Sequence, residues 1–548
     1  EELELFLYSP QIKLKNPPAG WPKTAKYEGL VHRMYRSVLN SEEGKLHREL
    51  LDPMTRRGVC PDCHGARLNE KVLSCTINGK NIAEVTAMPL RQLIDWLDTI
   101  QEPLAQDIQR TLGTRLRALV EIGLDYLTLD RSLGTLSGGE AQRCKIAKFL
   151  NSSLSDLLYI LDEPSVGLHS RDIERMKKAI RKLRDGGNTV LLVEHHREMI
   201  EVADHIVDMG PQAGVFGGEV LFQGSYDELL HSDTPTGEAL RYHSEIKQEP
   251  RTPSGWYSLE HASIHNLQDL SLRLPLGVLT AVVGVAGSGK SSLMECFCQE
   301  LGEQAVYISQ KNIGASLRST PATYLGVADE IRRIFAKGCG QKASLFSFNG
   351  EGKCPACGGK GVIVSDMSFM DSIETVCELC GGLRYSQEVL QFQVKGLNIA
   401  QVMDLTVEKA IRFFEGTSIA EALQPLCRVG LSYLHLNQSL STLSGGELQR
   451  MKLASCLNIR EKVFILDEPT DGLHLQDIQS LIALLDEMVE QGNSIFVIEH
   501  SLDVLKAADY VVELGPGGGS EGGCLLFAGS VKELKNCPTS VTAPYLQD

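Results

Sequence analysis

The stretch of sequence at residues 284–292, GVAGSGKSS, decides the fold class of the chain. It fits the phosphate-loop pattern G-x-x-x-x-G-K-[ST], with Gly284, Gly289, Lys290 and Ser291 in the defining positions. The apolar run LTAVVGV before it predicts a buried strand, and SLMECFCQEL after it predicts a helix. A glycine-rich turn alone would explain the glycines, but not the lysine, the hydroxyl and both flanking elements together.

This loop predicts that the chain binds ATP with Mg²⁺. Its glycines let backbone N–H groups wrap the phosphates, its lysine reaches the terminal phosphates, and the serine after the lysine can ligate Mg²⁺. We therefore expect the nucleotide to contact Gly284, Gly287, Gly289, Lys290, Ser291 and Ser292.

The composition is that of a globular chain, with 43% hydrophobic and 23% charged residues among 548. No apolar run approaches the roughly 20 residues of a membrane helix, and residues 1–30 lack a signal pattern, so we expect a cytoplasmic protein without a membrane partner. The net charge of −16 means that a DNA partner would require a local basic patch. Because the sequence begins with Glu1, we expect a fragment or a processed product.

The sequence contains an internal duplication. GLDYLTLDRSLGTLSGGEAQR at residues 123–143 recurs as GLSYLHLNQSLSTLSGGELQR at 430–450, and LYILDEPSVGLH at 158–169 recurs as VFILDEPTDGLH at 463–474. Offsets of 305 to 307 residues predict two versions of one unit. The same offset would place a first-half counterpart of Lys290 before residue 1, so this sequence holds one phosphate loop.

The duplication and a polar, proline-containing stretch between the copies predict the domain organisation. We expect a remnant of an N-terminal insert region at residues 1–57, a first ATPase unit without a phosphate loop at 58–240, a linker at 241–256, and a second ATPase unit at 257–548 with a signature and zinc insert at about 311–425.

Two carboxylates follow a predicted buried strand in each copy. In the second copy Asp467 can hold Mg²⁺ through water, and Glu468 can orient or deprotonate an attacking water. His500 follows the strand SIFVIE and is placed to touch a γ-phosphate. A lone Asp-Glu pair is more often a solvated turn, but its place after a buried strand, in a chain with a phosphate loop, favours catalysis.

The segment LSGGE occurs twice, each time before a predicted helix whose free N–H groups and dipole favour an anion. Together with LDEP and the later histidine, it resembles the ABC-type ATPases. The resemblance implies an α/β fold with two ABC-type ATPase units in tandem, the first incomplete. It also implies a nucleotide between the second-half phosphate loop and Ser137, Gly138 and Gly139 of the first half. The opposite LSGGE, at residues 444–446, has no phosphate loop to face.

Four cysteines in the second half predict a zinc site. Cys354, Cys357, Cys377 and Cys380 have the spacing C-x2-C-x19-C-x2-C, which suits a four-thiolate structural Zn²⁺ with no open position for catalysis. Cys60 and Cys63 resemble the second of these pairs, but no partner pair precedes them, so we expect no zinc there.

Basic residues surround the cysteine module. They are a solvated face or, in so acidic a chain, a contact for a phosphate backbone. As candidate DNA contacts we take Arg318, Arg332, Arg333, Lys337, Lys342 and Lys353, with Lys360 beside them.

The zinc insert between phosphate loop and signature, with RSTPATYLGVADEIRRIF at residues 318–335 and KNIAEVTAM at 80–88, resembles the UvrA family of the excinuclease ABC system. The resemblance implies an ATPase of nucleotide excision repair without nuclease activity. Such a protein dimerises, binds distorted double-stranded DNA by indirect readout, and passes it to a UvrB-like helicase. It also implies that Gln310 senses the γ-phosphate.

The sequence departs from the family pattern in three places. No first phosphate loop, first zinc pair or helicase-docking region is found here, which leaves recruitment of the helicase open. Only 19 residues separate Lys290 from Gln310, and one of two arginines expected before PATY is absent, leaving Arg318. Two alternatives stay open: a UvrA-like paralogue for resistance to DNA-binding drugs, and a DNA-binding scaffold with negligible turnover.

Overall fold

The computed structural model describes residues 2–13, 26–39, 58–136, 138–152, 154–211, 217–309, 319–365 and 373–546. Contacts between residues divide the chain into a small unit, Glu1–Val85, and a large unit, Thr86–Asp548. The borders expected at residue 57 and at 241–256 stay predictions, because the contacts define no further division.

The small unit consists of short elements. Only Ser9 and Gly29 are buried in its described part, so these residues form no hydrophobic core. Its elements in order are α1 (Glu2–Tyr8), β1 (Ile12–Lys13), β2 (Lys26–Tyr27), α2 (Leu30–Met34), a π-helical turn (Tyr35–Leu39), α5 (Glu70–Leu73), β3 (Thr76–Ile77), β4 (Lys80–Asn81) and α6 (Ile82–Thr86).

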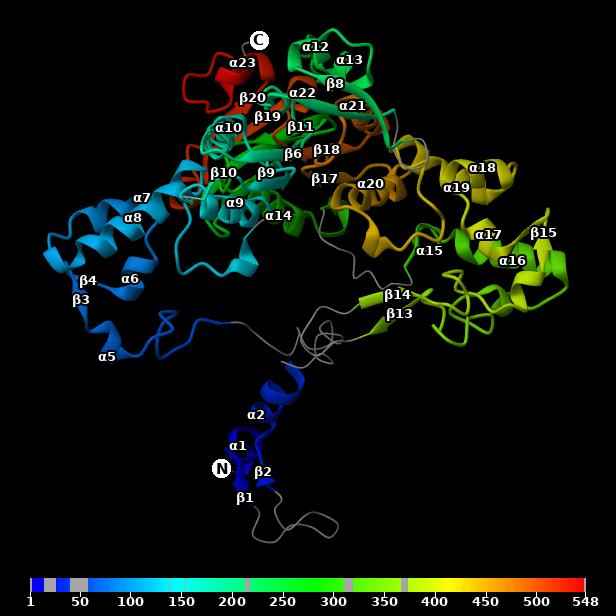
Figure 1. The fold of residues 1–548 in the computed structure, drawn as a ribbon, viewed down its shortest axis with the longest axis horizontal. Coiled ribbons are helices and arrows are strands. Elements are labelled where there is room, and N and C mark those ends of the chain that lie inside the picture. The colour runs from blue at the N-terminus through cyan, green and yellow to red at the C-terminus, as the bar shows by residue number, and fades with distance from the viewer. Residues whose placement is uncertain are drawn as a thin grey trace. The chain divides into compact units, whose positions relative to one another are not determined.

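A six-stranded sheet forms the centre of the second half of the large unit (Figure 1). Its order is β12-β17-β18-β11-β19-β20, and all neighbours pair in parallel except β19 and β20. Continuous apolar runs such as VFIL and SIFVI suit parallel strands, which are buried on both faces.

The elements of this half outside the insert are listed in chain order. They are β9 (Gly255–Ala262), β10 (Leu270–Leu276), β11 (Leu279–Val283), α14 (Lys290–Leu301), β12 (Ala305–Ile308), α20 (Gly445–Cys456), β17 (Val463–Asp467), α21 (Leu475–Glu490), β18 (Ser494–Ile498), α22 (Leu502–Ala507), β19 (Tyr510–Gly515), β20 (Cys524–Gly529) and α23 (Val531–Leu534).

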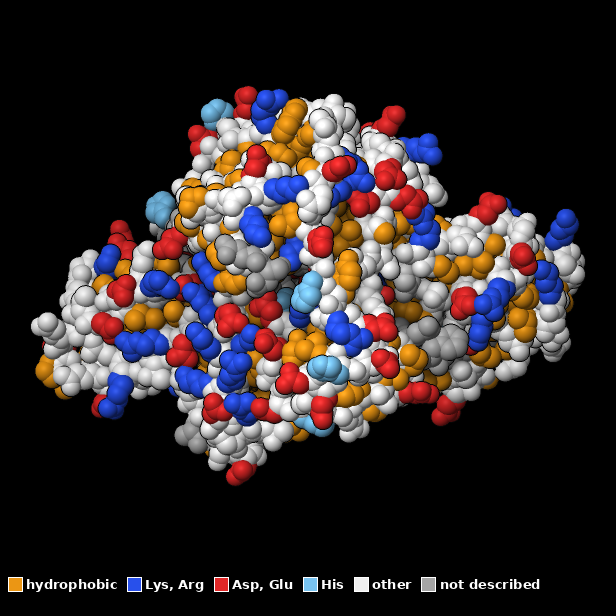
Figure 2. All heavy atoms as spheres, turned by 90° about the horizontal axis from the view of Figure 1, so that it is seen from above, with side chains coloured by type: hydrophobic (Ala, Val, Ile, Leu, Met, Phe, Trp, Pro, Cys, Tyr) orange, Lys and Arg blue, Asp and Glu red, His pale blue; other side chains and the backbone are white. Residues whose placement is uncertain are grey.

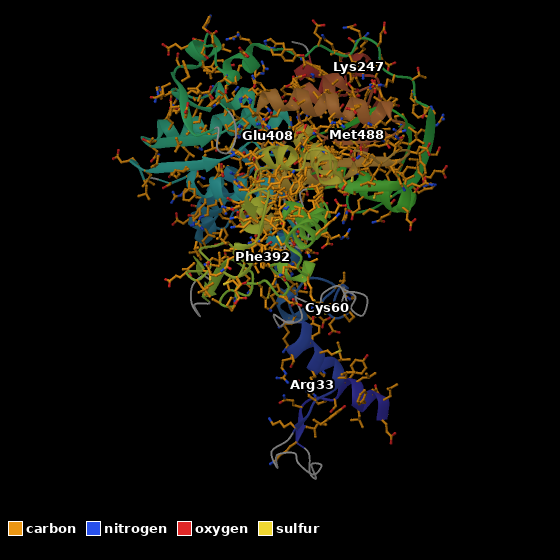
Figure 3. The ribbon with its side chains drawn as sticks, turned by 90° about the vertical axis from the view of Figure 1, so that its right-hand side faces the viewer. Arg33, Cys60, Lys247, Phe392, Glu408 and Met488 are labelled. Carbon is orange, nitrogen blue, oxygen red and sulfur yellow. The ribbon has the colours of Figure 1, made fainter. Side chains whose placement is uncertain are left out.

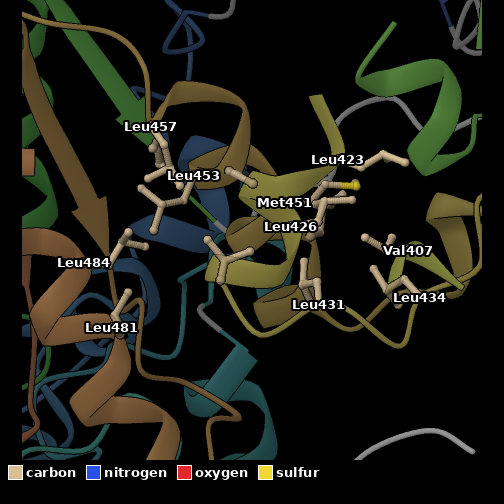
Figure 4. Close-up of a cluster of buried hydrophobic side chains, with 14 of the residues drawn as sticks. Val407, Leu423, Leu426, Leu431, Leu434, Met451, Leu453, Leu457, Leu481 and Leu484 are labelled. Atoms are coloured by element: carbon tan, nitrogen blue, oxygen red, sulfur yellow. The ribbon is translucent and has the colours of Figure 1, made fainter. Parts of the chain in front are cut away.

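The two faces of the sheet are covered by different layers. One face packs against α14 and the β9–β10 hairpin, where the rings of Phe297 and Phe496 meet with centroids 5.0 Å apart. The other face packs into a larger core that continues through α20 and α21 toward the insert. Figure 4 shows Met451, Leu453 and Leu484 within this continuous core.

The insert between β12 and α20 is mostly helical. In α16 the buried residues Val327, Ile331 and Phe335 recur every four residues and face the core, as in an amphipathic helix. The elements of the insert are α15 (Pro321–Tyr324), α16 (Val327–Cys339), β13 (Val362–Ser365), β14 (Ile373–Val376), β15 (Gln393–Val394), β16 (Leu397–Asn398), α17 (Ile399–Met403), α18 (Val407–Phe413) and α19 (Ser418–Arg428).

The first half of the large unit repeats part of this plan. Its elements are α7 (Leu90–Asp98), α8 (Gln106–Glu121), α9 (Gly138–Phe149), β5 (Leu158–Asp162), α10 (Ser170–Asp185), β6 (Thr189–Val193), α11 (Arg197–Ile200), β7 (Ile206–Gly210), β8 (Glu219–Gly224), α12 (Tyr226–Leu230) and α13 (Pro235–Arg241). Helices α7 and α8 lie at the opposite end of the large unit from α16–α19 (Figure 1).

The sheet of the first half is divided into two pairs of strands. β5 pairs in parallel with β6, and β7 pairs antiparallel with β8. In the second half, β11 joins the equivalent strands β18 and β19, whereas no strand among the described residues joins β6 to β7. The first half therefore has, within the described part of the chain, no counterpart of the strand that enters the phosphate loop.

The segment between the halves is fixed by ion pairs to the second half. Lys247 and Arg251 bind the carboxylates of Asp486 and the buried Asp509 at 2.5 to 3.3 Å. Lys247 lies beside α21, the helix that carries Met488 (Figure 3). The predicted α/β class and the tandem arrangement are confirmed. None of the described helices combines the length and the apolar character that crossing a membrane requires.

Candidate functional site

The phosphate loop lies between β11 and α14, so the predicted strand and helix around it are confirmed. Gly284, Gly287 and Gly289 have φ angles of 138°, 73° and 100°, which favour glycine. A Cβ on Gly284 would lie 2.2 Å from the carbonyl oxygen of Leu514. The path of the backbone therefore requires glycine at this position, independently of any ligand.

Lys290 is folded into its own loop. Its Nζ donates to the carbonyl oxygens of Gly284 at 2.9 Å and Val285 at 3.2 Å, and the residue is only 6% exposed. Burial lowers the pKa of Lys290, while the carboxylates of Glu468 and Asp467 oppose that shift. A bound phosphate would compete with the two carbonyls for this ammonium group.

The two serines after Lys290 differ in their surroundings. Ser291 is exposed at the start of α14, and Ser292 Oγ lies 3.3 Å from His265 Nδ1. Asp467, at the end of β17, accepts a hydrogen bond from the Tyr307 hydroxyl at 3.2 Å. Ser291 and Asp467 are the hydroxyl and carboxylate on either side of the loop that could hold Mg²⁺.

Glu468 and His500 are in contact just beyond the ends of β17 and β18. His500 Nε2 lies 3.3 Å from Glu468 Oε1. Burial acts to raise the pKa of Glu468, but the hydrogen bond from His500 and the charge of Lys290 outweigh it and hold the pKa at about 2. Burial and Lys290 lower the pKa of His500. At neutral pH the pair is therefore an ionised carboxylate beside a neutral imidazole.

Glu468 adopts a backbone conformation that is uncommon outside glycine. Its φ is 51°, and Glu163, its counterpart in the first half, has a φ of 45°. The Glu468 N–H donates to the Ile498 carbonyl at 2.9 Å, which helps to hold the strained residue in place. Strain of this kind is concentrated at functional sites, and both copies keep it.

A buried carboxylate organises the two loops beside this pair. Glu499 accepts hydrogen bonds from the backbone and hydroxyl of Thr470 and from the backbone N–H groups of His500 and Ser501. Glu194 makes the same set of bonds in the first half, with Ser165, His195 and His196. In each half, one carboxylate therefore joins the loop after the LDEP segment to the loop that carries the histidine.

The first half of the chain reaches the Glu468 carboxylate of the second. A Cβ on Gly167 would lie 3.2 Å from Glu468 Oε2, so the loop at residues 165–168 packs directly on that carboxylate. The approach is reciprocal, because a Cβ on Gly472 would lie 3.7 Å from Glu163 Oε1.

Tyr126 joins the phosphate loop to the first LSGGE helix. Its hydroxyl donates to Glu140 Oε1 at 2.5 Å, and Glu140 lies in the first turn of α9. Its ring faces the second half, since Cβ atoms on Gly287 and Gly518 would lie 2.9 and 2.8 Å from ring carbons. The start of α9 and the phosphate loop are thus on either side of one tyrosine.

The remaining predicted nucleotide contacts are placed in part. Ser137 and Gln310 lie outside the described residues. Gly138 is exposed at the first position of α9, and a Cβ on Gly139 would lie 2.8 Å from the Val166 carbonyl oxygen. The backbone at Gly139 is therefore packed against the same loop that reaches Glu468.

The four predicted zinc ligands come together in a buried cluster. Their Sγ atoms all lie within 4.8 Å of one another, with 3.9 Å between Cys354 and Cys377 and 3.7 Å between Cys357 and Cys380. Tetrahedral Zn²⁺ with Zn–S bonds near 2.3 Å would require sulfur separations of about 3.8 Å. The glycine knuckles are tight, because a Cβ on Gly359 would lie 1.8 Å from the Phe348 carbonyl oxygen. The residues present therefore fit a tetrahedral metal ion.

The candidate DNA-contacting side chains are not equally available. Arg318 lies outside the described residues. Arg332 pairs with Asp329 at 3.0 Å and donates to the Ala328 carbonyl, so its guanidinium is already engaged. The remaining four are exposed: Arg333, Lys337, Lys342 and Lys353. On the face drawn in Figure 2, acidic and basic side chains are interspersed, which agrees with the need for a local rather than a global basic surface.

Sequence reasoning missed several residues that build this centre. Tyr126 had a visible signal, because the repeat keeps a tyrosine at the equivalent position 433, where it also bonds the glutamate of its LSGGE segment. Gly167 belongs to the repeated LDEP-GLH segment, but its contact with Glu468 spans about 300 residues of sequence and could not be read from spacing.

Comparisons with known proteins identify the family of the chain. A family model described as ABC transporter matches residues 267–471. UvrABC system protein A from Streptomyces avermitilis is 42% identical over 568 aligned positions, which cover 96% of this chain and 56% of that protein. The protein of the same name from Thermus thermophilus is 42% identical, over 93% of this chain and 58% of its own length. The chain thus spans a little more than half the length of these relatives.

A solved structure matches over more of its length. The crystal structure of UvrA2 from Deinococcus radiodurans superposes with a TM-score of 0.88 and 36% identity, covering 99% of this chain and 74% of that one. The sequence and structural matches extend over nearly the whole chain, and the chain belongs to the UvrA family of ABC-type ATPases.

Proposed function

We propose that the chain binds and hydrolyses ATP at one composite site. The second half supplies the phosphate loop, and the first half supplies its LSGGE segment with the loop at residues 165–168. The observation that carries this proposal is the position of Glu468, whose carboxylate contacts His500 of its own half and Gly167 of the other.

The side chains have distinct roles in this proposal. Lys290 and the loop glycines hold the phosphates, and Gln310 senses the γ-phosphate. Glu468 orients the attacking water, because a carboxylate with a pKa of about 2 is a weak base but a strong hydrogen-bond acceptor. His500 contacts the γ-phosphate once its single ring proton, which faces Glu468 in this structure, turns to the phosphate. Asp467 and Ser291 would hold Mg²⁺, which neutralises phosphate charge when bound.

The coupling partner in this proposal is double-stranded DNA that is damaged or distorted. Arg333, Lys337, Lys342 and Lys353 would contact the phosphate backbone from the insert, and deformability of the duplex would provide the specificity. A homodimer and a cytoplasmic location complete the proposal. A UvrB-like helicase would receive the DNA, and the only support from the relatives is that their names assign them to a UvrABC system.

A second candidate function is that of a UvrA-like paralogue acting on DNA that carries bound drugs. The observation that supports it is the similarity to the crystal structure of UvrA2, with 36% identity and a TM-score of 0.88. Both functions need the same ATP site, so the DNA substrate distinguishes them.

The test is ATP hydrolysis by the purified chain without DNA, with intact duplex, with duplex carrying a bulky adduct, and with duplex carrying an intercalator. The repair function predicts the largest stimulation with the adduct, and the paralogue function predicts it with the intercalator. Absence of hydrolysis under all four conditions would leave a DNA-binding scaffold.

We also propose that Cys354, Cys357, Cys377 and Cys380 hold a structural Zn²⁺. Elemental analysis should give about one zinc per chain. Cys377→Ser should release it and lower the melting temperature, whereas Cys63→Ser should leave the zinc content unchanged. Two zinc ions per chain would contradict this assignment.

A further inference from the structure

Two hydrogen-bond relays cross between the halves of the large unit. In the first, His169 Nε2 lies 3.1 Å from Thr542 Oγ1, and Thr542 Oγ1 donates to Glu513 Oε1 at 2.5 Å. The second relay consists of His474, Thr236 and Asp208, with corresponding distances of 3.0 and 2.7 Å. The matched residues are 305 or 306 positions apart in the sequence. The same relay is therefore built twice, in opposite directions.

The direction of each hydrogen bond in the first relay is fixed by its surroundings. His169 Nδ1 accepts from the Arg171 N–H at 3.2 Å, so the ring proton lies on Nε2 and is donated to Thr542. The Thr542 N–H also donates to Glu513 Oε1, at 2.8 Å. His169 and Thr542 are 3% exposed and Glu513 is fully buried. Because unsatisfied polar groups are costly at such sites, the three side chains are held in one arrangement.

The first relay ends at the catalytic pair of the second half. His169 directly follows the loop at residues 165–168, whose Gly167 packs on Glu468. The His169 ring also meets the His500 ring edge-on, with centroids 6.3 Å apart and planes at 83°. The first half thus contacts the pair twice, through Gly167 and through the His169 ring. The relay connects both contacts to Thr542 in the C-terminal segment and to Glu513 in β19.

We propose that Thr542 and His169 are positioning residues for ATP hydrolysis: through Glu513 they hold the 165–168 loop of the first half against Glu468 and His500. This inference rests on the proposed hydrolysis at the second-half site. In the proposed site neither Thr542 nor His169 contacts the nucleotide. Their effect is therefore on the geometry of Glu468 and His500 and not on the affinity for ATP.

The second relay provides a matched control within the same chain. His474 follows the loop at residues 470–473, which packs on Glu163 in the same way. Glu163 and His195 have no phosphate loop beside them in this sequence. Breaking the second relay should therefore loosen the contact of this loop with Glu163. The bonds from Thr470 to Glu499 keep the loop in place beside Glu468, so turnover should be unaffected.

The experiment compares Thr542→Val, Thr542→Ser and Thr236→Val in the full chain. Thr542→Val removes the hydroxyl from a site of nearly the same volume and should lower kcat about tenfold, with KM for ATP changed by less than about twofold. Thr542→Ser keeps the hydroxyl and should stay near the parent. Thr236→Val should leave kcat within about twofold of the parent, and melting temperatures confirm that each variant is folded.

Hydrogen exchange supplies a readout that does not depend on turnover. Thr542→Val should speed exchange in residues 165–172, including the Arg171 amide that bonds His169, and Thr236→Val should do so in residues 470–477. Equal loss of kcat in both valine variants, or a serine variant as defective as the valine one, would overturn the proposal. Unchanged exchange at 165–172 would also overturn it. If the parent itself does not hydrolyse ATP, the proposed function fails, while exchange still reports whether the relay holds the loop.

Discussion

The two halves of the large unit share a sequence repeat but differ in how their sheets are covered. In the first half, six apolar side chains on one sheet face are 45 to 64% exposed: Leu158, Ile160, Leu191, Val193, Val207 and Met209. Their counterparts 305 residues later are at most 8% exposed: Val463, Ile465, Phe496, Ile498, Val512 and Leu514. The second half covers this face with α14 and the β9–β10 hairpin, and it fills the middle of the sheet with β11.

This difference shows that one segment, residues 255–301, has both a structural role and a role at the phosphate loop. Residues 255–301 close the sheet, bury its apolar face and carry the phosphate loop. Complete burial of a large aliphatic side chain is worth about 1.5–3 kcal/mol, so covering the six half-exposed side chains would stabilise the first half by about 5–10 kcal/mol. Among the described residues of the first half, no segment covers the sheet face in this way.

The strongest way to break the comparison is to remove the lysine that only the second half has. Lys290→Ala should lower kcat for ATP hydrolysis on the order of 100-fold or more, because it removes a buried positive charge that the phosphates require. Lys182→Ala, at a half-exposed lysine of the first half, is the control and should keep full turnover. Retention of more than about a tenth of the parent rate would place hydrolysis elsewhere.

The two LSGGE segments provide the next test. Ser137→Arg should lower turnover about 100-fold, since it puts a bulky cation where the nucleotide meets the first half. Ser444→Arg should lose the cap that Ser444 makes with the Glu447 N–H, which costs about 1 kcal/mol of stability. Its turnover should stay within about twofold of the parent. Equal loss of turnover in the two variants would contradict a single composite site.

The open sheet of the first half should also be visible without nucleotide. Amides of β6 and β7 should exchange with solvent at least about tenfold faster than those of β18 and β19, because the latter are bonded on both sides to neighbouring strands and lie beneath a packed layer. Mass spectrometry after peptic digestion measures both pairs in one sample. Equal protection would show that the first-half sheet is covered in solution.

The smallest expected difference lies between two histidines. The hydrogen bond with Glu163 raises the pKa of His195 against the effect of burial, whereas burial and Lys290 lower the pKa of His500. Protonation of His195 therefore adds stability below pH 6.5 that is lost as the pH rises through its folded pKa. Protonation of His500 costs stability as the pH falls below 6.5.

NMR titration of the imidazole signals, assigned with His195→Gln and His500→Gln, measures this order directly. Lys290→Met should raise the pKa of His500 and leave that of His195 unchanged. A higher pKa for His500 than for His195 in the parent chain would contradict the charge assignment at the site.

Local patterns were sufficient to predict part of this structure. The phosphate loop, its strand and helix, the duplication and the cysteine quartet follow from short-range spacing, because each is defined within one loop or one pair of knuckles. The pairing of Arg332 with Asp329 also follows from helical spacing, since residues three apart share a face. From the sequence, the basic residues near the cysteine module form one group of candidate DNA contacts. That grouping does not separate Arg332, which is paired with Asp329, from the others.

Contacts across the halves could not be predicted in this way. His169 and Thr542 are 373 residues apart, and neither belongs to a motif with a known partner. The exposure of Leu158 and Ile160 was equally invisible, because their apolar run has the same pattern as the buried run at residues 463–466. Whether a strand face is buried depends on which segment packs on it, and that is a property of the tertiary structure.

The central claim is that this chain carries one complete ATP site, built from both halves. Its most direct test is the stoichiometry of ATP binding to the Glu468→Gln chain, in which slow hydrolysis lets the bound nucleotide be counted by calorimetry or equilibrium dialysis. The account predicts one ATP per chain, and none at the same concentrations when Lys290→Ala is added. Two ATP molecules per chain, or one that persists after the lysine is replaced, would contradict it.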